Sequence, residues 1–311
     1  MAENTQDELI VIAAWLYYVE RMTHEEIAEQ LHMSRVSITR LLQRARSEGV
    51  VQFTITRPLP KQYRLGNRIK EKYNLSSVTI AKTMSDPNET TKEVCRYAAF
   101  EMMKHLTQNC RLGVAFSSTL SNMIEFLDGK SAPSNIVIQE LAGTYLSPNA
   151  PYGISWRIAE KLNAKIISLP VPVVVQSESV RNAMMEEPSI KEAFQGISNV
   201  DVCIVGLGYI GPDSTLVRTG HFTPEMMNEL KRKGAVGDIL LHFYDRDGNY
   251  VENPIKDRMI ILDYDDLKRI PKVIGVATGP EKIVAIHGAL KSGTVHHLVT
   301  DMETAQAVLD E

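Results

Sequence analysis

The sequence is poor in several residue types, and each shortage excludes a class of protein. Its 311 residues include only three cysteines, Cys95, Cys110 and Cys203. An odd number of widely spaced cysteines fits neither a disulfide framework nor the ligand spacing of a zinc site. We therefore expect these thiols to be reduced and buried, and we expect no metal site and no cofactor.

Long apolar runs and a positive net charge are also missing. No apolar segment is long enough to span a membrane, and the N-terminal residues do not have the pattern of a signal peptide, so we expect a cytoplasmic protein. The formal net charge is −4 and the isoelectric point is near 6.1. Since the whole chain would not attract nucleic acid, any DNA binding must come from a local basic patch.

Residues 23–46, THEEIAEQLHMSRVSITRLLQRAR, contain such a patch. Thr23 is placed to cap a short helix, and Glu26 three residues later completes a capping box. A tight turn follows at residues 32–33, and Ser34 is placed to cap a second helix that carries four arginines and no acidic residue. Two short helices joined in this way predict a helix-turn-helix.

The second of these helices has an apolar side and a polar side. Its apolar positions are Ile38, Leu41, Leu42 and Ala45, which we expect to be buried. The residues that we expect to contact DNA are Ser34, Arg35, Val36, Ser37, Thr39, Arg40, Gln43 and Arg44. The N-terminal part of such a helix enters the major groove, so we assign contacts with base edges to Arg35, Val36, Ser37 and Thr39. We assign contacts with phosphate groups to Arg40 and Arg44. The alternative is a plain helical hairpin with a solvated charged face.

The flanking segments complete a small domain. Residues 7–18 have apolar side chains at helical spacing, and Gly49 is placed to end the second helix of the motif. Residues 50–55 alternate as in a strand, which predicts a wing. The two prolines of Arg57-Pro58-Leu59-Pro60 disfavour helix and central strand, so we expect a winged helix-turn-helix domain over residues 1–58 and a second domain over residues 59–311.

The second domain alternates strand-like and helical segments, which is typical of an α/β fold with a parallel sheet. We expect a helix over residues 63–73 and strands at residues 78–81, 111–115, 136–141, 165–169, 200–205, 273–276 and 298–300. Open α/β sheets of the Rossmann type bind ligands at the carboxyl ends of their strands. The loops that follow these strands are therefore where a binding site is sought.

Two of these loops are short and polar. Ser117, Ser118 and Thr119 follow one strand and precede a helical run, where hydroxyl groups and backbone N–H groups suit a phosphate. The alternative there is simple helix capping by Ser117 or Ser118, without any ligand. Gly143 and Thr144 follow the next strand, and on their own they are weak evidence for a binding site.

A third loop, GLGYIG at residues 206–211, matches the dinucleotide pattern G-x-G-x-x-G by letter. We reject a dinucleotide site because Pro212 and the polar residues after it leave no helix to receive a pyrophosphate. The loop can still line a site with its backbone N–H groups. We include Gly206, Leu207, Gly208 and Tyr209 among the candidate ligand contacts.

Two further loops place opposite charges near glycines. Asp238 follows Gly234 and Gly237, and Lys282 begins a helical run after Gly279. A sugar hydroxyl could bridge a carboxylate and an ammonium group, although isolated charges in loops are more often solvated. His296 and His297 are adjacent and would diverge on a strand, so we interpret both as structural or surface residues.

The chain as a whole resembles the SorC-type (SorC/DeoR) sugar-binding transcriptional regulators of bacteria. The most specific segments are YYVERMTHEEIAEQLHMSRVSITRLLQRARSEGVV, VDVCIVGLGYIG, GAVGDILLHFYDRDG and GVATGPEKIVAIHGALKSGTVHHLVTD. The resemblance implies a C-terminal domain related to sugar-phosphate isomerases and glucosamine-phosphate deaminases. It also implies operator DNA as a partner, a phosphorylated sugar or polyol as effector, and a homo-oligomer, typically a tetramer built as a dimer of dimers.

Carried over by position, the resemblance implies effector contacts in the loops described above. These contacts are Ser117, Ser118, Thr119, Gly143, Thr144, Gly206, Leu207, Gly208, Tyr209, Asp238 and Lys282. The first loop departs from several relatives, which have a glycine and threonine run where this chain has Phe116 and two serines. We expect Phe116 to narrow the pocket and to alter the preferred ligand.

The leading hypothesis is a regulator of a carbohydrate operon that a phosphorylated sugar controls through unequal affinity for two arrangements of the protein. One alternative is a sugar-phosphate isomerase or deaminase with a DNA-binding appendage, in which Asp238 is a general base and Lys282 anchors phosphate. We disfavour it because such chemistry usually needs a second acid. Another alternative is a regulator that responds to a protein partner, which small sugar phosphates would not stabilise against heating.

Overall fold

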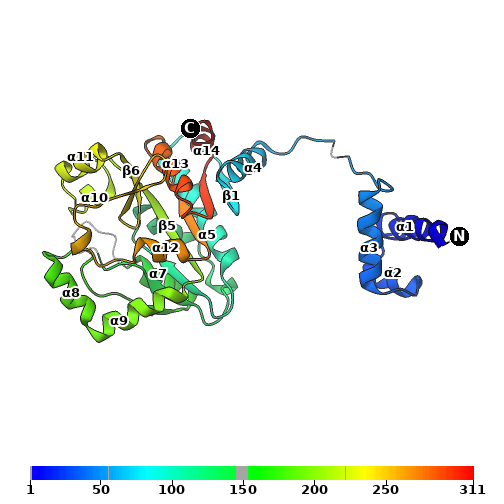
Figure 1. Ribbon diagram of the computed structural model, residues 1–311, viewed down its shortest axis with the longest axis horizontal. Coiled ribbons are helices and arrows are strands. Elements are labelled where there is room, and N and C mark those ends of the chain that lie inside the picture. Colours follow the sequence, from blue (N-terminus) through cyan, green and yellow to red (C-terminus); the bar gives the residue numbers. More distant parts are fainter. Residues whose placement is uncertain (1, 55, 145–152, 221) are drawn as a thin grey trace. The chain divides into compact units, whose positions relative to one another are not determined.

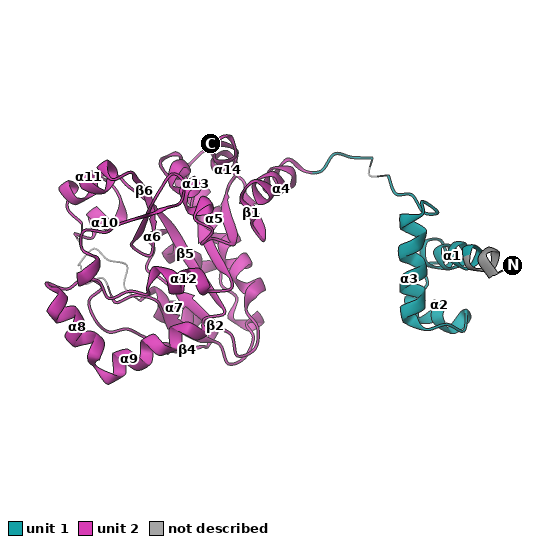
Figure 2. Ribbon diagram, in the orientation of Figure 1, with its two compact units in different colours: residues 1–59 teal, residues 60–311 magenta. Residues whose placement is uncertain are grey.

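The computed structural model describes residues 2–54, 56–144, 153–220 and 222–311. The chain divides into two compact units, residues 1–59 and residues 60–311 (Figure 2). The division falls between the two prolines of the segment at residues 57–60. Each unit has its own hydrophobic core, so each is described by itself.

The first unit is built from α1 (Ala2–Tyr18), α2 (His24–Gln30) and α3 (Arg35–Ser47) (Figure 1). The capping box is confirmed, because the Thr23 hydroxyl accepts the backbone N–H of Glu26 and the Glu26 carboxylate accepts the backbone N–H of Thr23. Ser34 caps α3 by accepting the backbone N–H of Ser37. The expected apolar side of α3 is buried against α1 and α2, which confirms the helix-turn-helix.

The expected wing is wrong for the residues that the structure describes. Gly49, with a φ of 75°, ends α3 as predicted, but residues 50–54 form no strand. Ile55, the last residue of the expected strand, lies outside the described residues. The exposed ring of Phe53 instead lies against the Tyr18 ring and the Arg46 guanidinium. A strand needs a partner strand, and the described part of the first unit supplies none.

The second unit is built on a 10-stranded sheet whose parallel part has the order β1-β10-β9-β5-β2-β3-β4. Its parallel strands are β1 (Ser77–Ala81), β2 (Arg111–Val114), β3 (Val137–Glu140), β4 (Lys165–Ile167), β5 (Val202–Tyr209), β9 (Val273–Val276) and β10 (His297–Asp301). Every strand expected from the sequence is present, although several ends are shifted. The Rossmann-like α/β fold is confirmed.

Helices cover both faces of this sheet. One face packs against α5 (Pro87–His105), α6 (Ser118–Ser121), η1 (Asn122–Phe126) and α7 (Ile154–Leu162). The other face packs against α4 (Lys61–Tyr73), α13 (Ile283–Lys291) and α14 (Met302–Asp310). The peripheral helices are α8 (Glu178–Glu186), α9 (Pro188–Gln195), α10 (Thr215–Arg218), α11 (Pro224–Arg232), α12 (Tyr264–Arg269), η2 (Gly129–Ser131), η3 (Gly196–Asn199), η4 (Lys256–Arg258) and η5 (Pro280–Lys282).

An antiparallel extension of the sheet was not expected from the sequence. The strands β6 (Ala235–Ile239), β7 (His242–Asp245) and β8 (Tyr250–Val251) pair in succession, and β6 pairs with the end of β5. The predictions of a loop at residues 206–209 and of a loop carrying Asp238 are therefore wrong. Both segments are strand because Leu207–Tyr209 and Gly237–Ile239 satisfy each other's backbone groups.

The cysteines and the lengths of the helices bear on two further expectations. Cys95, Cys110 and Cys203 are free thiols and all three are buried, as predicted. None of the described helices combines the length and the apolar character needed to cross a membrane.

Candidate functional site

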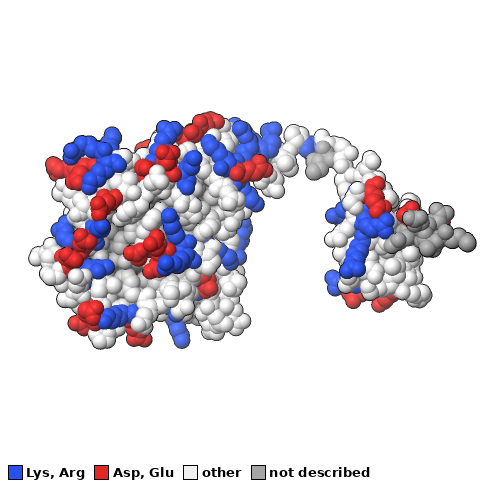
Figure 3. Space-filling model, viewed as in Figure 1, with Lys and Arg blue, Asp and Glu red and all other residues white. Residues whose placement is uncertain are grey.

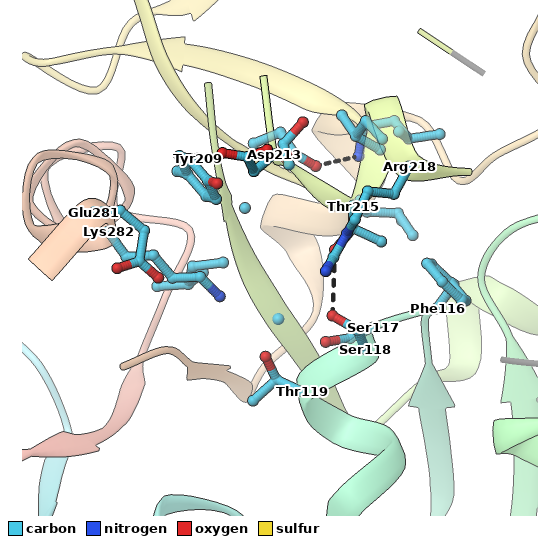
Figure 4. A pocket seen from close by; sticks show the side chains of 18 of the residues that line it. Phe116, Ser117, Ser118, Thr119, Tyr209, Asp213, Thr215, Arg218, Glu281 and Lys282 are labelled. Atoms are coloured by element: carbon cyan, nitrogen blue, oxygen red, sulfur yellow. Dashed lines mark hydrogen bonds between the residues drawn. The ribbon is translucent and has the colours of Figure 1, made fainter. Parts of the chain in front are cut away.

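A cavity of about 380 Å³ opens at the carboxyl ends of β2, β5 and β9, where a parallel sheet is expected to bind ligands. Figure 4 shows side chains from these separate segments converging on one space. The cavity is lined by Thr91, Phe116, Ser117, Ser118, Thr119, Ala142, Gly206, Leu207, Gly208, Tyr209, Asp213, Ser214, Thr215, Leu216, Arg218, Asp238, Leu240, Leu241, Thr278, Glu281 and Lys282.

The structure brings together all of the expected effector residues except Gly143 and Thr144, which are not in the lining. Their backbone N–H groups donate to the carbonyl oxygens of Ile260, at 2.9 Å, and Val171, at 2.7 Å. A Cβ at Gly143 would lie 2.6 Å from the Val171 carbonyl oxygen. Gly143 is thus explained by close backbone packing. Tyr145 lies outside the described residues.

The hydroxyl-rich segment after β2 has two roles. Ser117 caps α6 and accepts the backbone N–H of Leu120 at 3.3 Å, which is the simple capping alternative. Ser118 instead faces the cavity, where its hydroxyl lies 3.2 Å from the hydroxyl of Thr215 (Figure 4). Ser118 and Thr215 therefore present a pair of hydrogen-bonded hydroxyls to a ligand, whereas the Ser117 hydroxyl serves the helix cap.

The two glycines at the end of β5 are explained by close side-chain approach. A Cβ at Gly206 would lie 2.3 Å from the Ser117 hydroxyl oxygen, and a Cβ at Gly208 would lie 1.9 Å from Oδ1 of Asp238. Any other residue at either position would displace a side chain of the cavity wall. The G-x-G pattern therefore serves side-chain packing at the cavity, consistent with the rejection of a dinucleotide site.

Asp238 is a buried carboxylate at the cavity wall. It lies on β6, is 7% exposed, and accepts the backbone N–H of Leu241 at 3.1 Å. Burial raises the pKa of Asp238 to about 6, although the Leu241 N–H and the charge of Lys282 act to lower it. Near neutral pH the side chain is a carboxylate that can accept hydrogen bonds from a ligand.

Two cationic side chains reach the same cavity. Lys282 stands at the start of α13 as predicted, and burial lowers its pKa while the carboxylates of Glu281 and Asp238 act to raise it. The charge of Arg218 also acts to lower the pKa of Lys282, so the two cations repel each other. Figure 4 places Lys282 across the cavity from Ser118 and Thr119. The lining also carries the carboxylates of Asp213, Asp238 and Glu281, so the cavity offers both cations and hydrogen-bond acceptors to a ligand.

Sequence reasoning missed the part of the lining that comes from α10 and the turn before it. Arg218 contacts Thr215 at 3.3 Å, and the buried hydroxyl of Ser214 has no hydrogen-bond partner among the described residues. An unpartnered buried hydroxyl is unusual, and this one belongs to a residue of the cavity lining. The run of polar residues after the last glycine of GLGYIG was the signal, but it was used only to exclude a dinucleotide.

The turn between β6 and β7 is strained where it meets the cavity. Ile239 pairs with His242, so Leu240 and Leu241 form a two-residue turn in which φ is 52° and 63°. Such turns prefer asparagine and glycine, and leucine rarely adopts positive φ. Both leucines line the cavity, and strained backbone of this kind is frequent at functional sites.

In the first unit, the polar side of α3 is open to solvent. Arg35, Val36, Arg40 and Gln43 are exposed, and Figure 3 shows basic side chains gathered along this helix. Arg44 donates to Glu48 at 2.7 Å. Thr39 is partly buried, and its hydroxyl donates to the Arg35 carbonyl oxygen and lies 3.2 Å from Nδ1 of His24.

Comparison with known proteins gives two matching family models. Residues 57–310 match a family described as "Putative sugar-binding domain", and residues 15–48 match "Sigma-70, region 4". The first match covers nearly all of the second unit, and the second match covers the helix-turn-helix.

Several regulators are similar to this chain over almost its whole length. The deoxyribonucleoside regulator of Bacillus subtilis is 29% identical over 99% of this chain and 99% of its own length. The transcriptional regulator LsrR of Klebsiella pneumoniae is 29% identical over 98% of this chain and 93% of its own length. The solved structure of the full-length sorbitol operon regulator SorC from Klebsiella pneumoniae superposes with a TM-score of 0.75 at 25% identity, over 97% of this chain and 98% of that one.

Proposed function

Since this chain belongs to the SorC-type family of sugar-binding transcriptional regulators, we propose that it controls a carbohydrate operon in the cytoplasm. In this proposal the first unit binds operator DNA, and a phosphorylated sugar or polyol bound in the second unit changes that binding. The chemistry of the cavity carries the proposal, because one space of about 380 Å³ holds two cations, several hydroxyls and the carboxylates of Asp213, Asp238 and Glu281.

The cations of the cavity suit the phosphate group of such an effector, and the Asp238 carboxylate suits its hydroxyl groups. A phosphate group needs cations and hydrogen-bond donors, which Lys282, Arg218 and the Ser118 hydroxyl supply. Sugar hydroxyls need acceptors, and the Asp238 carboxylate is one. The cavity volume is within the range that small-molecule sites occupy. The names of relatives, which include a deoxyribonucleoside regulator and a regulator of erythritol catabolism, are consistent with small polyhydroxylated effectors.

The proposed DNA contacts keep the assignment made from the sequence. Arg35 and Val36 lie exposed at the N-terminal end of α3, which is the part of the helix that enters the major groove. Arg40 is exposed one turn later and is assigned to a phosphate. The Thr39 hydroxyl is already hydrogen-bonded, so this residue offers a base mainly its methyl group.

We also propose that the protein acts as a tetramer built as a dimer of dimers. Paired helix-turn-helix units read half-sites about 34–36 Å apart, and a second pair permits binding at two operators. Light scattering of the purified protein should give about four times the chain mass of 34.8 kDa. A monomer at working concentration would contradict this part of the proposal.

The test of the proposed function is selection of genomic fragments by the purified full-length protein, at moderate salt, with and without a panel of sugar and polyol phosphates. We expect enrichment of a two-fold repeated site beside carbohydrate genes, and a changed yield with one of the phosphates. Failure to enrich any fragment under all conditions would contradict the proposal. Turnover of aldose or ketose phosphates by the same preparation would instead favour the enzyme alternative.

The effector site is tested separately with Lys282→Ala. Because Lys282 is proposed to hold the phosphate, this variant should bind operator normally and lose its response to the effector. Lys291→Ala is the matched control, since Lys291 is an exposed lysine at the other end of α13. A Lys282→Ala protein that responds as the control does would remove Lys282 from the site.

A further inference from the structure

Three side chains of metal-ligand type meet at the edge of the sheet opposite the cavity. Glu101 and His105 lie one turn apart near the C-terminal end of α5, and His297 is the first residue of β10. The cavity lies at the carboxyl ends of the strands, whereas His297 begins its strand. This cluster is therefore separate from the proposed effector site.

The distances within the cluster fit a single ion. Nε2 of His105 lies 3.4 Å from Oε1 of Glu101, and Nδ1 of His297 lies 3.9 Å from the same oxygen. One ligand atom from each residue lies within 4.8 Å of the other two. Bonds of about 2.0–2.2 Å in tetrahedral geometry separate ligand atoms by about 3.3–3.6 Å. Side-chain rotations that shorten the longer separations would bring all three groups into coordination distance.

The spacing in the sequence supports the same arrangement. Glu101 and His105 are four residues apart on one helix, so their side chains project from the same face. Two ligands at this spacing on a helix are a common way to bind zinc. The third ligand comes from β10, and residues of α5 and β10 are packed in the same core, which fixes the distance between the two elements.

Neighbouring hydroxyls orient the ligands. The Thr79 hydroxyl and the Lys104 ammonium donate to Oε2 of Glu101, at 3.0 and 2.8 Å, which leaves Oε1 toward the histidines. The Ser77 hydroxyl donates to Oε1 at 2.9 Å and lies 2.8 Å from Nδ1 of His297. These two atoms would face the ion, so the Ser77 hydroxyl must turn away when the ion binds, whereas the hydrogen bonds to Oε2 can remain as outer support.

The site also has a path to solvent. Glu101 and His297 are buried, but the side chain of His105 is 18% exposed. An ion can enter along His105, and a water molecule can complete a four-ligand shell there. One carboxylate oxygen with two imidazole nitrogens is a ligand set that zinc accepts, and imidazole also suits copper and nickel.

We propose that Glu101, His105 and His297 bind a divalent transition-metal ion of the zinc class, which ties the end of α5 to the start of β10. The competing interpretation is a purely structural network in which the Ser77 hydroxyl bridges Glu101 and His297. The two differ in whether the protein binds a stoichiometric metal ion through His105.

The test is equilibrium dialysis of full-length protein, stripped with a chelator, against Zn²⁺, with the bound metal measured by mass spectrometry. Wild type should bind one ion per chain, and Co²⁺ in its place should give the intense visible absorption of a four-coordinate site. His105→Gln and Glu101→Gln should each weaken binding at least tenfold. Both substitutions keep a hydrogen-bonding side chain, and His105 is partly exposed, so the His105 variant is expected to fold.

His32→Asn is the matched control, because His32 is an exposed histidine of the first unit with a φ of 52°, a conformation that asparagine tolerates. It should bind the metal as wild type does. Zn²⁺ should also raise the melting temperature of wild type and of His32→Asn but not of His105→Gln. Equal zinc binding by His105→Gln and wild type, or no stoichiometric ion in wild type, would overturn the proposal without bearing on the effector site.

Discussion

Arg35 and Arg40 lie on the same helix and are both exposed, yet the two residues are assigned different contacts. Arg35 stands at the first position of α3, where a side chain reaches base edges. Arg40 stands more than one turn further on, and we assign it to a phosphate of the duplex backbone. The two arginines have the same charge and are both exposed, so their assigned contacts differ because of their positions along the helix.

Arg35→Ala should weaken operator binding by about 1–3 kcal/mol and relax the sequence preference at one base pair. Arg40→Ala is the comparison, since loss of a phosphate contact should weaken binding to all DNA and reduce the salt dependence by about one ion. Binding of operator variants and of random DNA at several salt concentrations measures both effects. Equal losses on every sequence for Arg35→Ala would contradict its assignment to a base.

Asp238 makes folding stability depend on pH. Its pKa in the folded protein is about 6, against an ordinary value of 3.8, so between these values the folded state holds a proton that the unfolded state has released. Stability should therefore fall as pH rises through this window, by about 3 kcal/mol at most. Below the window the carboxyl is protonated in both states, and above it the loss is complete.

Asp238→Asn should remove this contribution while keeping an oxygen that accepts the Leu241 N–H. Urea unfolding of both proteins from pH 4 to pH 7, followed by Trp156 fluorescence in a Trp15→Phe background, measures the difference. We expect the stability of wild type to fall relative to Asp238→Asn as the pH rises. A difference that stays constant across this range would contradict the raised pKa.

At the scale of elements, the pairing of β5 with β6 builds the wall of the cavity. Gly208 and Asp238 are directly paired across the two strands, and the missing side chain of the glycine makes room for the carboxylate. The turn that follows β6 holds Leu240 and Leu241 at positive φ, and both side chains are largely buried. Burial of two leucines stabilises by several kcal/mol, which offsets a strain of about 1–3 kcal/mol for each.

Gly208→Ala should destabilise the second unit by about 1–3 kcal/mol, because its Cβ would lie 1.9 Å from Oδ1 of Asp238. In an Asp238→Ala background the same substitution should cost much less, since the obstructing oxygen is gone. A double-mutant cycle on unfolding free energies measures this coupling. Gly206→Ala is the control, because its Cβ would meet Ser117, so Asp238→Ala should not rescue it.

At the scale of the whole molecule, the two compact units have separate cores and separate chemistry. The basic side chains of α3 belong to the first unit, and the cavity belongs to the second. Effector binding can change DNA binding only if the bound form favours one arrangement of the assembled units. In the proposed tetramer, the arrangement of the chains sets the separation of the recognition helices, so we expect the two activities to be coupled there.

The spacing of the operator half-sites tests whether two recognition helices bind as a pair. Adding about 5 base pairs between the half-sites turns them to opposite sides of the duplex and should abolish paired binding, whereas adding about 10 should restore part of it. Gel-shift titration of the three operators measures the effect. Equal affinity for all three would indicate that single units bind independently.

The sequence alone determined the features that depend on neighbours along the chain. The capping box at Thr23, the buried side of α3 and the parallel strands were all predictable, because caps and periodic patterns are local signals. The same local signals predicted a wing at residues 50–55, which was wrong for the described residues 50–54 because a strand also needs a partner. Local signals also predicted correctly that Lys282 stands at the start of a helix and that Ser117 can cap one.

Only the tertiary structure decided which of these residues share a site. Leu207–Tyr209 and Asp238 were expected in loops, but each segment is a strand because the other, about thirty residues away in the sequence, satisfies its backbone. Arg218 and Ser214 line the cavity although they were not expected there, whereas Gly143 and Thr144 were expected there and do not. Glu101 lies close to His297, almost two hundred residues away in the sequence. Contacts of this kind depend on how strands are ordered in the sheet, and that order is not written in any local pattern.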